Sequence, residues 1–452
     1  MQAMKWSILA LAVAAGTTQL AFADQQSESK GFVEDSKLTL LNRNYYFNRS
    51  TETGSRDANG LKQAHDPRSW SHGFLLNYAS GFTQGTVGVG VDAFGYLGLK
   101  LDGGSGHAGT GNLPTTSKGE QQDEYSTVGA AAKLRVSNTI LKFGNLQPTS
   151  PVFALGSSRL FPQTGTGFML TSEEIENLFF EAGHFTAARN NVNTFHDGEI
   201  GTGYTSINNV TVRSADYLGG KYKFNDQLSA SLYYGKLANV WNQYYGNLNY
   251  VQPLSANQSL TFDANYYLTK DAGSKQAGDI DTNAFSLAAA YSIDAHTFTL
   301  GFQKVNGSTP FDYAGAGGKR DGLNNGVSGG DGIFLANSVQ YSDFNAPGEK
   351  SWQARYDLNM ATLGVPGLSF MARYIRGTGI DASSNEIYQA YNGYADGGKE
   401  RETNLEAKYV VQSGPAKDLS FRARQAWHRG DDGTGGTINE FRLITEYPLN
   451  IL

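Results

Sequence analysis

Apolar and polar residues alternate with a period of two along most of the chain. Within residues 259–268, the apolar residues Leu260, Phe262, Ala264 and Tyr266 share one face, and polar neighbours occupy the other. The same alternation recurs in residues 297–305, 352–358, 368–374, 405–409, 419–427 and 441–451. This pattern predicts β-strands in a sheet that has one apolar and one polar face.

Eighteen strands are expected, and turn-rich links separate them. We place them at 36–48, 68–79, 85–98, 123–134, 138–146, 165–174, 178–188, 214–224, 228–238, 241–252, 258–268, 283–292, 296–305, 351–360, 367–375, 401–411, 418–428 and 437–450. Links on one side are short, as in 223–227 and 292–296, whereas links on the other side are long and rich in Gly, Asn and Asp. An even number of strands leaves both ends of the chain on the same side.

Strand length and link length together favour a barrel. Strands of about 10 residues, short links on one side, long links on the other, and aromatic residues near the ends of the apolar faces are typical of outer-membrane barrels. Closure pairs every backbone group and removes the sheet edges. We therefore expect an all-β fold, an 18-stranded antiparallel transmembrane β-barrel with inward-folded loops. A soluble sandwich, with its apolar face inside, is the alternative that alternation alone leaves open.

The amino terminus indicates export. Lys5 precedes an apolar run from Trp6 to Ala15, and the small-residue site Ala21-Phe22-Ala23 follows it. We predict that residues 1–23 are a removed signal peptide and that residues 24–452 form a single barrel domain. A buried amino-terminal helix is the alternative. The absence of Cys fits a protein of the bacterial envelope, and the barrel predicts the outer membrane.

Composition excludes several classes of protein. Beyond the amino-terminal segment, no apolar run reaches the roughly 18 residues of a transmembrane helix, and mean hydropathy is -0.40. The 55 Gly are not periodic and aromatic residues make up 12% of the chain, which excludes collagen and a disordered polymer. The net charge of -6 gives no basic excess for a phosphate backbone, so nucleic acid is not an expected partner.

On the barrel assignment, inward positions of the last strands carry many cations. These are Arg355, Arg373, Lys408, Arg422, Arg424 and Arg442, and closure brings Arg43 and Arg49 of the first strand beside them. In one interpretation, each Arg pairs with an inward acid such as Glu406, Glu440 or Glu446 and stabilises the wall. In the other, successive guanidinium groups pass a carboxylate from one site to the next.

Two long links have unusual compositions. Residues 147–164 are too apolar and too rich in Pro for a solvated tip, so we expect them to fold into the lumen and offer Arg159 to a carboxylate. Residues 306–350 place Asp331 and Asp343 among aromatic residues, where an ammonium group could bind. Solvated loop charge is the alternative interpretation of these acids.

Several stretches have counterparts in a known family. The sequence Pro151-Val152-Phe153-Ala154-x-Gly156-x-Ser158-Arg159-Leu160-x-Pro162-Gln163-Thr164-x-Thr166-Gly167-Phe168 resembles the inward third loop of the OprD family of substrate-specific porins of pseudomonads. The likeness extends through residues 99–104, 181–185, 335–343, 370–374 and 439–444. One departure is the terminal Leu452, because many outer-membrane proteins end in an aromatic residue.

The resemblance implies a monomeric pore, with at most weak association, in contact with outer-membrane lipid and lipopolysaccharide. Residues 147–164 and 306–350 would form its constriction. It also implies passive diffusion of small carboxylate-bearing solutes. The loop is similar to that of the OccD branch, which selects basic amino acids and short peptides and is used by carbapenem antibiotics. The sister branch, which prefers cyclic or aromatic carboxylates such as benzoate, is the alternative.

The resemblance also implies roles for single residues. Matching motifs assign the constriction to Ser158, Arg159, Tyr204, Asp331, Tyr341 and Asp343, and a basic ladder to Arg373, Lys408, Arg422, Arg424 and Arg442. Tyr204 has the weakest basis, because the surrounding stretch 199–209 is the least distinctive.

Catalysis finds little support in the sequence. His184 and Asp197 permit a hydrolase in principle, but no Gly-x-Ser-x-Gly motif occurs and the seven His lack metal-ligand spacing. We therefore predict no catalytic, cofactor or metal site. An outer-membrane hydrolase and a periplasmic binding sandwich are the alternative classes.

Overall fold

The computed structural model describes residues 24–51, 55–56, 62–63, 66–104, 106–202, 212–320, 323–381, 397–431 and 434–452. The expected signal peptide, residues 1–23, and the candidate Tyr204 lie outside the described residues. No helix in these ranges has the length and apolar character required to cross a membrane.

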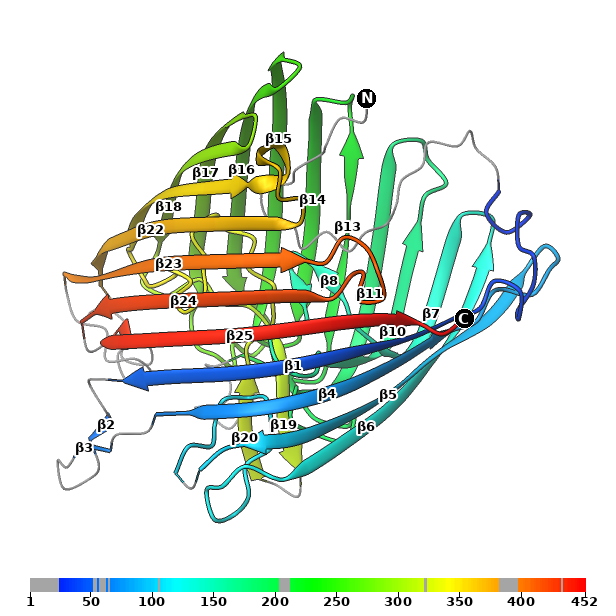
Figure 1. The fold of residues 1–452 in the computed structure, drawn as a ribbon, viewed down its shortest axis with the longest axis horizontal. Coiled ribbons are helices and arrows are strands. Elements are labelled where there is room, and N and C mark those ends of the chain that lie inside the picture. The colour runs from blue at the N-terminus through cyan, green and yellow to red at the C-terminus, as the bar shows by residue number, and fades with distance from the viewer. Residues whose placement is uncertain are drawn as a thin grey trace.

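Eighteen antiparallel strands form one closed barrel, which confirms the predicted fold class (Figure 1). They are β1 (Lys37–Thr51), β4 (Arg68–Ala79), β5 (Gly88–Asp102), β6 (Glu124–Val136), β7 (Thr139–Leu146), β10 (Thr164–Ser172), β11 (Leu178–Arg189), β13 (Ala215–Lys223), β14 (Leu228–Leu237), β15 (Trp241–Ser255), β16 (Gln258–Asp271), β17 (Asp281–Ile293), β18 (His296–Asn306), β21 (Lys350–Asn359), β22 (Leu368–Ile380), β23 (Gly398–Val410), β24 (Ser420–Gly430) and β25 (Thr437–Asn450). Each predicted strand overlaps one of these. Closure occurs where β1 pairs with both β4 and β25.

Short elements in the links were not predicted. They are β2 (Ser55–Arg56), β3 (Lys62–Gln63), β8 (Thr149–Ser150), β9 (Phe153–Ala154), β12 (Ile200–Gly201), β19 (Gly315–Arg320), β20 (Leu323–Ser328) and the 3₁₀ helix η1 (Met360–Leu363). The strands β12, β19 and β20 form a separate three-stranded sheet, which ties the link after β11 to the link after β18.

The two ends of the barrel differ in the length of their links. Residues 256–257 and 294–295 are two-residue turns at one end, whereas residues 307–349 make a long connection at the other. In the short link 224–227, the Asn225 side chain accepts hydrogen bonds from the backbone amides of Gln227 and Leu228. Outer-membrane barrels place short turns in the periplasm, so the long links face the cell exterior.

The strand faces follow the predicted orientation, with apolar side chains outside. Leu232, Leu300 and Trp352 are 74%, 68% and 65% exposed, as lipid-facing residues must be in a protein without its bilayer. Their sequence neighbours on the inner face are polar and covered, as in Gln353, whose side chain donates to the backbone carbonyl of Ala336.

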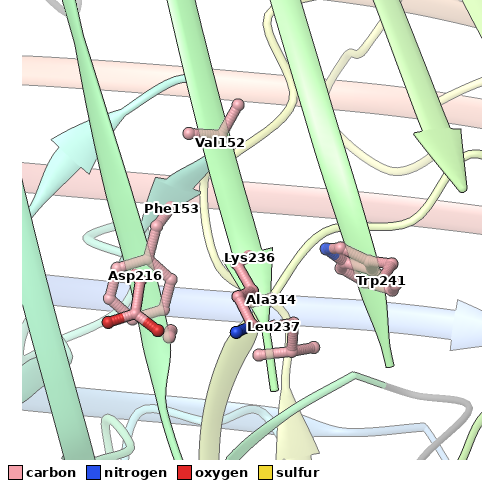
Figure 2. A pocket seen from close by; sticks show the side chains of 8 residues that line it. Val152, Phe153, Asp216, Lys236, Leu237, Trp241 and Ala314 are labelled. Atoms are coloured by element: carbon pink, nitrogen blue, oxygen red, sulfur yellow. The ribbon is translucent and has the colours of Figure 1, made fainter. Parts of the chain in front are cut away.

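The buried core lies inside the barrel, where the link between β7 and β10 meets both walls. Phe153 and Leu155 pack in one apolar cluster with Trp241 of β15, whereas Leu160 and Phe161 pack in a second cluster at the opposite wall. Figure 2 shows members of the first cluster, among them Phe153, Leu237 and Trp241. The wall allows this close approach at Gly235, because a Cβ there would lie 2.7 Å from Cβ of Val152. The segment therefore crosses the lumen as a packed element.

Candidate solute pathway

Two links meet inside the barrel. The backbone amide of Ser157 donates to the Asp331 carboxylate at 2.9 Å, and the Asp331 amide donates to the carbonyl of Ala154 at 3.0 Å. The Gln163 side chain adds a hydrogen bond to the carbonyl of Gly329 at 3.2 Å. Asp331 therefore joins residues 147–163 to residues 307–349, and these bonds occupy part of its carboxylate. Burial raises the pKa of the Asp331 carboxyl group.

Strand β1 holds the first of these links against the wall. One nitrogen of Arg43 donates to the carbonyls of Arg159 and Leu160 at 2.8 and 3.1 Å, and Tyr45 donates to the carbonyl of Ser158 at 3.1 Å. With its backbone fixed in this way, Ser158 exposes its side chain to the lumen.

The Arg159 side chain is held from two sides. Its Nε donates to the carbonyl of Thr110 at 2.9 Å, and its guanidinium lies 5.4 Å from the ring centre of Phe47. Burial lowers the pKa of Arg159 to about 10. The group therefore remains charged at neutral pH.

The second link is anchored by two glutamates of the wall. Glu402 of β23 accepts hydrogen bonds from the amides of Tyr341 and Ser342 at 3.1 and 2.9 Å. Glu440 of β25 accepts from the side chain of Gln340 at 3.3 Å. The Tyr341 ring lies 5.1 Å from the Arg49 guanidinium carbon, which places this predicted constriction residue beside the cationic wall.

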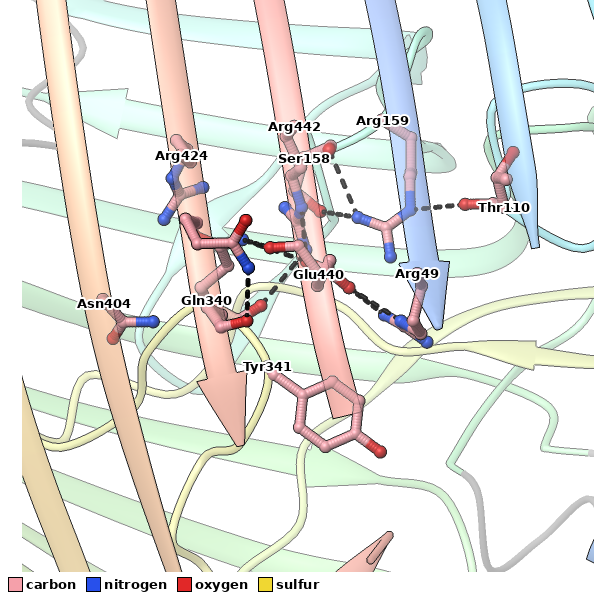
Figure 3. A network of polar contacts seen from close by, with 12 residues as sticks. Arg49, Thr110, Ser158, Arg159, Gln340, Tyr341, Asn404, Arg424, Glu440 and Arg442 are labelled. Atoms are coloured by element: carbon pink, nitrogen blue, oxygen red, sulfur yellow. Dashed lines mark hydrogen bonds and ion pairs between the residues drawn. The ribbon is translucent and has the colours of Figure 1, made fainter. Parts of the chain in front are cut away.

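Glu440 is the centre of a dense cationic cluster (Figure 3). Its fully buried carboxylate pairs with Arg49 at 2.5 Å and with Arg442 at 2.6 Å. Arg442 also donates to the carbonyl of Gln340 at 3.1 Å. One carboxylate thus serves two guanidinium groups.

A similar arrangement occurs on the neighbouring strands. Glu406 of β23 lies 2.8 Å from Arg422 and 3.1 Å from Arg424. Cross-strand register places Arg424 opposite Arg442 and Lys408 opposite Arg422, so the two groups are continuous on the inner wall. Four of the five predicted ladder residues therefore lie together, namely Lys408, Arg422, Arg424 and Arg442.

The remaining inward cations have different partners. Arg373 is buried and donates to the side chain of Asn404 at 3.0 Å. Arg355 pairs with Asp357 on its own strand, and Arg43 with Glu446, both at 2.7 Å. Lys408 is exposed and has no ion pair with any residue in the described ranges.

The loop acids are bound by hydroxyl groups. Asp343 accepts hydrogen bonds from Tyr313 at 2.6 Å and from Ser338 at 2.5 Å, and burial raises its pKa. Burial raises the pKa of Asp312 to about 7, because the Tyr313 amide and Thr202 satisfy only part of that carboxyl group. Asp312, Asp331 and Asp343 therefore form an acidic part of the second link.

Sequence reasoning missed Asp312, Tyr313 and Glu402. Their partners are distant in sequence, as in the Tyr313 to Asp343 hydrogen bond across 30 residues. Asp312-Tyr313 repeats the pairing of acid and aromatic residue that drew attention to Asp343-Phe344, and this was the one signal available.

Comparison with known proteins gives consistent results. The family described as outer membrane porin, OprD family, matches residues 30–451. Porin D of Pseudomonas aeruginosa is 58% identical over 460 residues, which cover all of both chains.

Solved structures agree with this assignment. The crystal structure of Pseudomonas aeruginosa OprD is 55% identical, with a TM-score of 0.79, and the match covers 95% of this chain and 99% of that one. The structure of Pseudomonas aeruginosa OpdK with vanillate is 33% identical, with a TM-score of 0.80, and covers 93% of this chain and 100% of that one. The chain therefore belongs to the OprD family of outer membrane porins: it is a substrate-specific channel of the bacterial outer membrane and not an enzyme.

Proposed function

We propose that the channel passes small carboxylate-bearing solutes by passive diffusion, and that basic amino acids and short peptides are its main substrates. Carbapenem antibiotics, which also carry a carboxylate, would use the same path. The observation that carries this proposal is the continuous inner surface of Arg422, Arg424 and Arg442, in which carboxylates are fewer than guanidinium groups.

Because two arginines share each glutamate, some of their N–H donors remain available on the inner wall. A guanidinium group has five N–H donors. Glu406 meets Arg422 and Arg424 through one oxygen, and Glu440 gives one oxygen to Arg49 and the other to Arg442. A solute carboxylate can therefore bind the remaining donors of Arg422 and Arg424, whose side chains are 40% and 18% exposed, without displacing the internal pairs. Several equivalent positions in succession permit both entry and exit, as a conducting pathway requires.

The loop acids supply the second half of the selectivity. A basic amino acid presents an ammonium or guanidinium group as well as a carboxylate. Asp331 and Asp343 are candidate partners for that cation, while Ser158 and Arg159 bind the carboxylate from the facing link. Tyr204 stays a prediction for this constriction, since it lies outside the described residues.

The alternative is a channel for cyclic or aromatic carboxylates. It has a specific basis, because the OpdK structure contains vanillate, an aromatic carboxylate. Identity to OpdK is 33%, whereas identity to Porin D is 58%, and this difference supports the basic amino acid branch.

Solute uptake into liposomes distinguishes the two proposals. We expect labelled arginine to enter faster than benzoate through the wild-type protein. Replacement of Asp343→Asn should lower arginine uptake by about tenfold, equivalent to about 1.4 kcal/mol, and benzoate uptake much less. The amide keeps the size of the side chain and an acceptor for Tyr313. An equal loss for both solutes would contradict the role of Asp343, and faster benzoate uptake would favour the aromatic branch.

Replacement of Arg422 and Arg424 together by Ala tests the inner wall. We expect uptake of both carboxylates to fall, because both depend on the same guanidinium groups. The fraction of protein that migrates as a folded barrel before heating serves as the control for assembly. Unchanged uptake by correctly folded protein would refute the role of these arginines.

A further inference from the structure

A second cationic surface lies on the outside of the barrel. It occupies the exterior ends of β18 and β21–β24, next to the long links. We call it the outer rim cluster, and it comprises Lys304, Lys350, Arg376, Arg401 and Arg429.

Strand alternation fixes the direction of these side chains. Arg376 is exposed, whereas its inward neighbour Ile375 is fully buried. Arg401 is exposed between Glu400 and Glu402, which are 5% and 0% exposed. The outer rim cluster is therefore separate from the arginines of the lumen.

Strand register brings the five cations together. Lys304 lies directly opposite Lys350, and Arg401 lies between Arg376 and Arg429 as the cross-strand partner of both. Adjacent strands are about 4.8 Å apart, and like charges directly opposite each other destabilise a sheet. An anion bound between these cations would relieve that repulsion.

The chain supplies no such anion within the described ranges. There, Lys304, Lys350, Arg376 and Arg401 form no ion pair with any acid. Within the same ranges, Arg429 donates only to neutral groups, namely two backbone carbonyls and the Asn439 side chain.

The adjoining part of the same rim, at the exterior ends of β11 and β13–β17, shows that unpaired cations are not a general property of the rim. There an in-register row crosses six strands and comprises His184, Asp216, Lys236, Asn242, Lys270 and Asp281. His184 pairs with Asp216 and Lys270 with Asp281, both at 2.5 Å. Charge on that side is balanced within the chain.

Aromatic side chains lie just below the outer rim cluster. Trp352, Tyr374 and Trp427 are 65%, 43% and 36% exposed on the same face. Trp352 is the direct cross-strand partner of Arg376. Exposed Trp and Tyr mark the boundary between hydrocarbon and headgroups in membrane proteins. The cluster is therefore at headgroup level in the outer leaflet.

We propose that the outer rim cluster binds the phosphate groups of a phosphorylated lipid of the outer leaflet. The arginine fork matches phosphate geometry, and lysines add point charges at its edge. The lipid's acyl chains would lie along the aromatic and aliphatic surface directly below. This surface favours a lipid over a free anion, which would contact the cations alone. The proposal does not depend on which solute the channel passes.

Binding of lipid A to the purified barrel in detergent tests the proposal, with native mass spectrometry as the readout. The probes are diphosphoryl lipid A, lipid A without phosphates, and inorganic phosphate. The test variant replaces Arg376 and Arg401 by Ala, and a matched control replaces Lys236 and Lys270 by Ala on the balanced part of the rim. We expect the test variant to bind diphosphoryl lipid A at least tenfold more weakly, with the control within about twofold of wild type.

A second variant separates charge from shape. Replacement of Arg376 and Arg401 by Lys should restore part of the lost affinity, because positive charge returns without the planar fork. Equal binding of phosphorylated and unphosphorylated lipid A, or equal losses in the test and control variants, would overturn the proposal. Competition by inorganic phosphate at the same concentration as lipid A would assign the cluster to free anions instead.

Discussion

Strand β24 carries arginines on both faces, and the partners of these arginines differ between the two faces. Arg424 points into the lumen and lies 3.1 Å from Glu406, whereas Arg429 points outward and, among the described residues, donates only to neutral acceptors. The same contrast holds between Arg442, which pairs with Glu440 inside, and Arg401, which has no ion pair with a described residue outside.

The difference reflects what surrounds each face. Inside, the two long links cover the wall, so a guanidinium group must find its acceptors within the chain. These are carboxylates for Arg422, Arg424 and Arg442 and an amide for Arg373. Outside, the rim meets headgroups and water, so a counter-charge can come from another molecule. Pairing inside holds Arg422, Arg424 and Arg442 in position along the pathway. The absence of pairing outside leaves the outer rim cluster available to a ligand.

Removal of Glu440 should have the largest effect. Glu440→Ala would leave Arg49 and Arg442 without their shared carboxylate, and Arg442 is only 5% exposed in its side chain. Loss of one partner from a buried pair costs about 3–5 kcal/mol, and we expect the free energy of unfolding in urea to fall by that amount.

Glu446→Ala is the matched control, because among the described residues Glu446 pairs with Arg43 alone, and its side chain is 34% exposed. A surface pair contributes about 0–1 kcal/mol, and we expect the half-buried Arg43–Glu446 pair to contribute less than the pairs of the fully buried Glu440. Similar losses of unfolding free energy for the two variants would show that a carboxylate shared by two arginines stabilises the barrel no more than one that pairs with a single arginine.

Glu406→Gln should change selectivity more than stability. It removes one negative charge between Arg422 and Arg424 but keeps a side chain of the same size. We expect the reversal potential in a salt gradient to move toward anions, with the permeability ratio rising about twofold or more. Asp281→Asn removes the same charge from the outer face and should leave the potential unchanged. Equal shifts would mean that the measurement reports total charge alone.

Asp312 should make stability depend on pH. Its pKa in the folded protein is about 7, above the ordinary value of 3.8, so the folded state binds a proton more tightly than the unfolded state. Stability should therefore fall as pH rises between about 4 and about 7. Asp312→Asn should reduce this slope, as measured by the temperature at which the barrel loses its folded migration. An unchanged slope would assign the dependence to other acids.

The sequence predicted the barrel well because the signals for strands and turns come from residues that are close together in the sequence. Period-two alternation and turn residues identified all eighteen strands, and the faces followed from them. The inward direction of Arg422 and Arg424 came from the same alternation, since Phe421 next to them is 42% exposed on the outer face.

Contacts between distant segments were beyond this reasoning. Nothing near Glu402 indicates that it binds the amides of Tyr341 and Ser342, which lie 61 and 60 residues away. The outer rim cluster depends on register across five strands, and a shift of one residue would place each cation inside. Period-two alternation alone does not determine which residues of neighbouring strands lie opposite each other.

Arg401→Ala should have the smallest effect on the isolated barrel. In detergent without added lipid, the side chain has no ion pair with a described residue, and Arg376 and Arg429 lie directly opposite it. We expect the free energy of unfolding to change by less than about 0.5 kcal/mol, or to rise slightly as like-charge repulsion is relieved. Added diphosphoryl lipid A should then stabilise the wild type more than the variant. A large loss without lipid would mean that the chain itself satisfies Arg401, and the contrast between the two faces of the strands would fail.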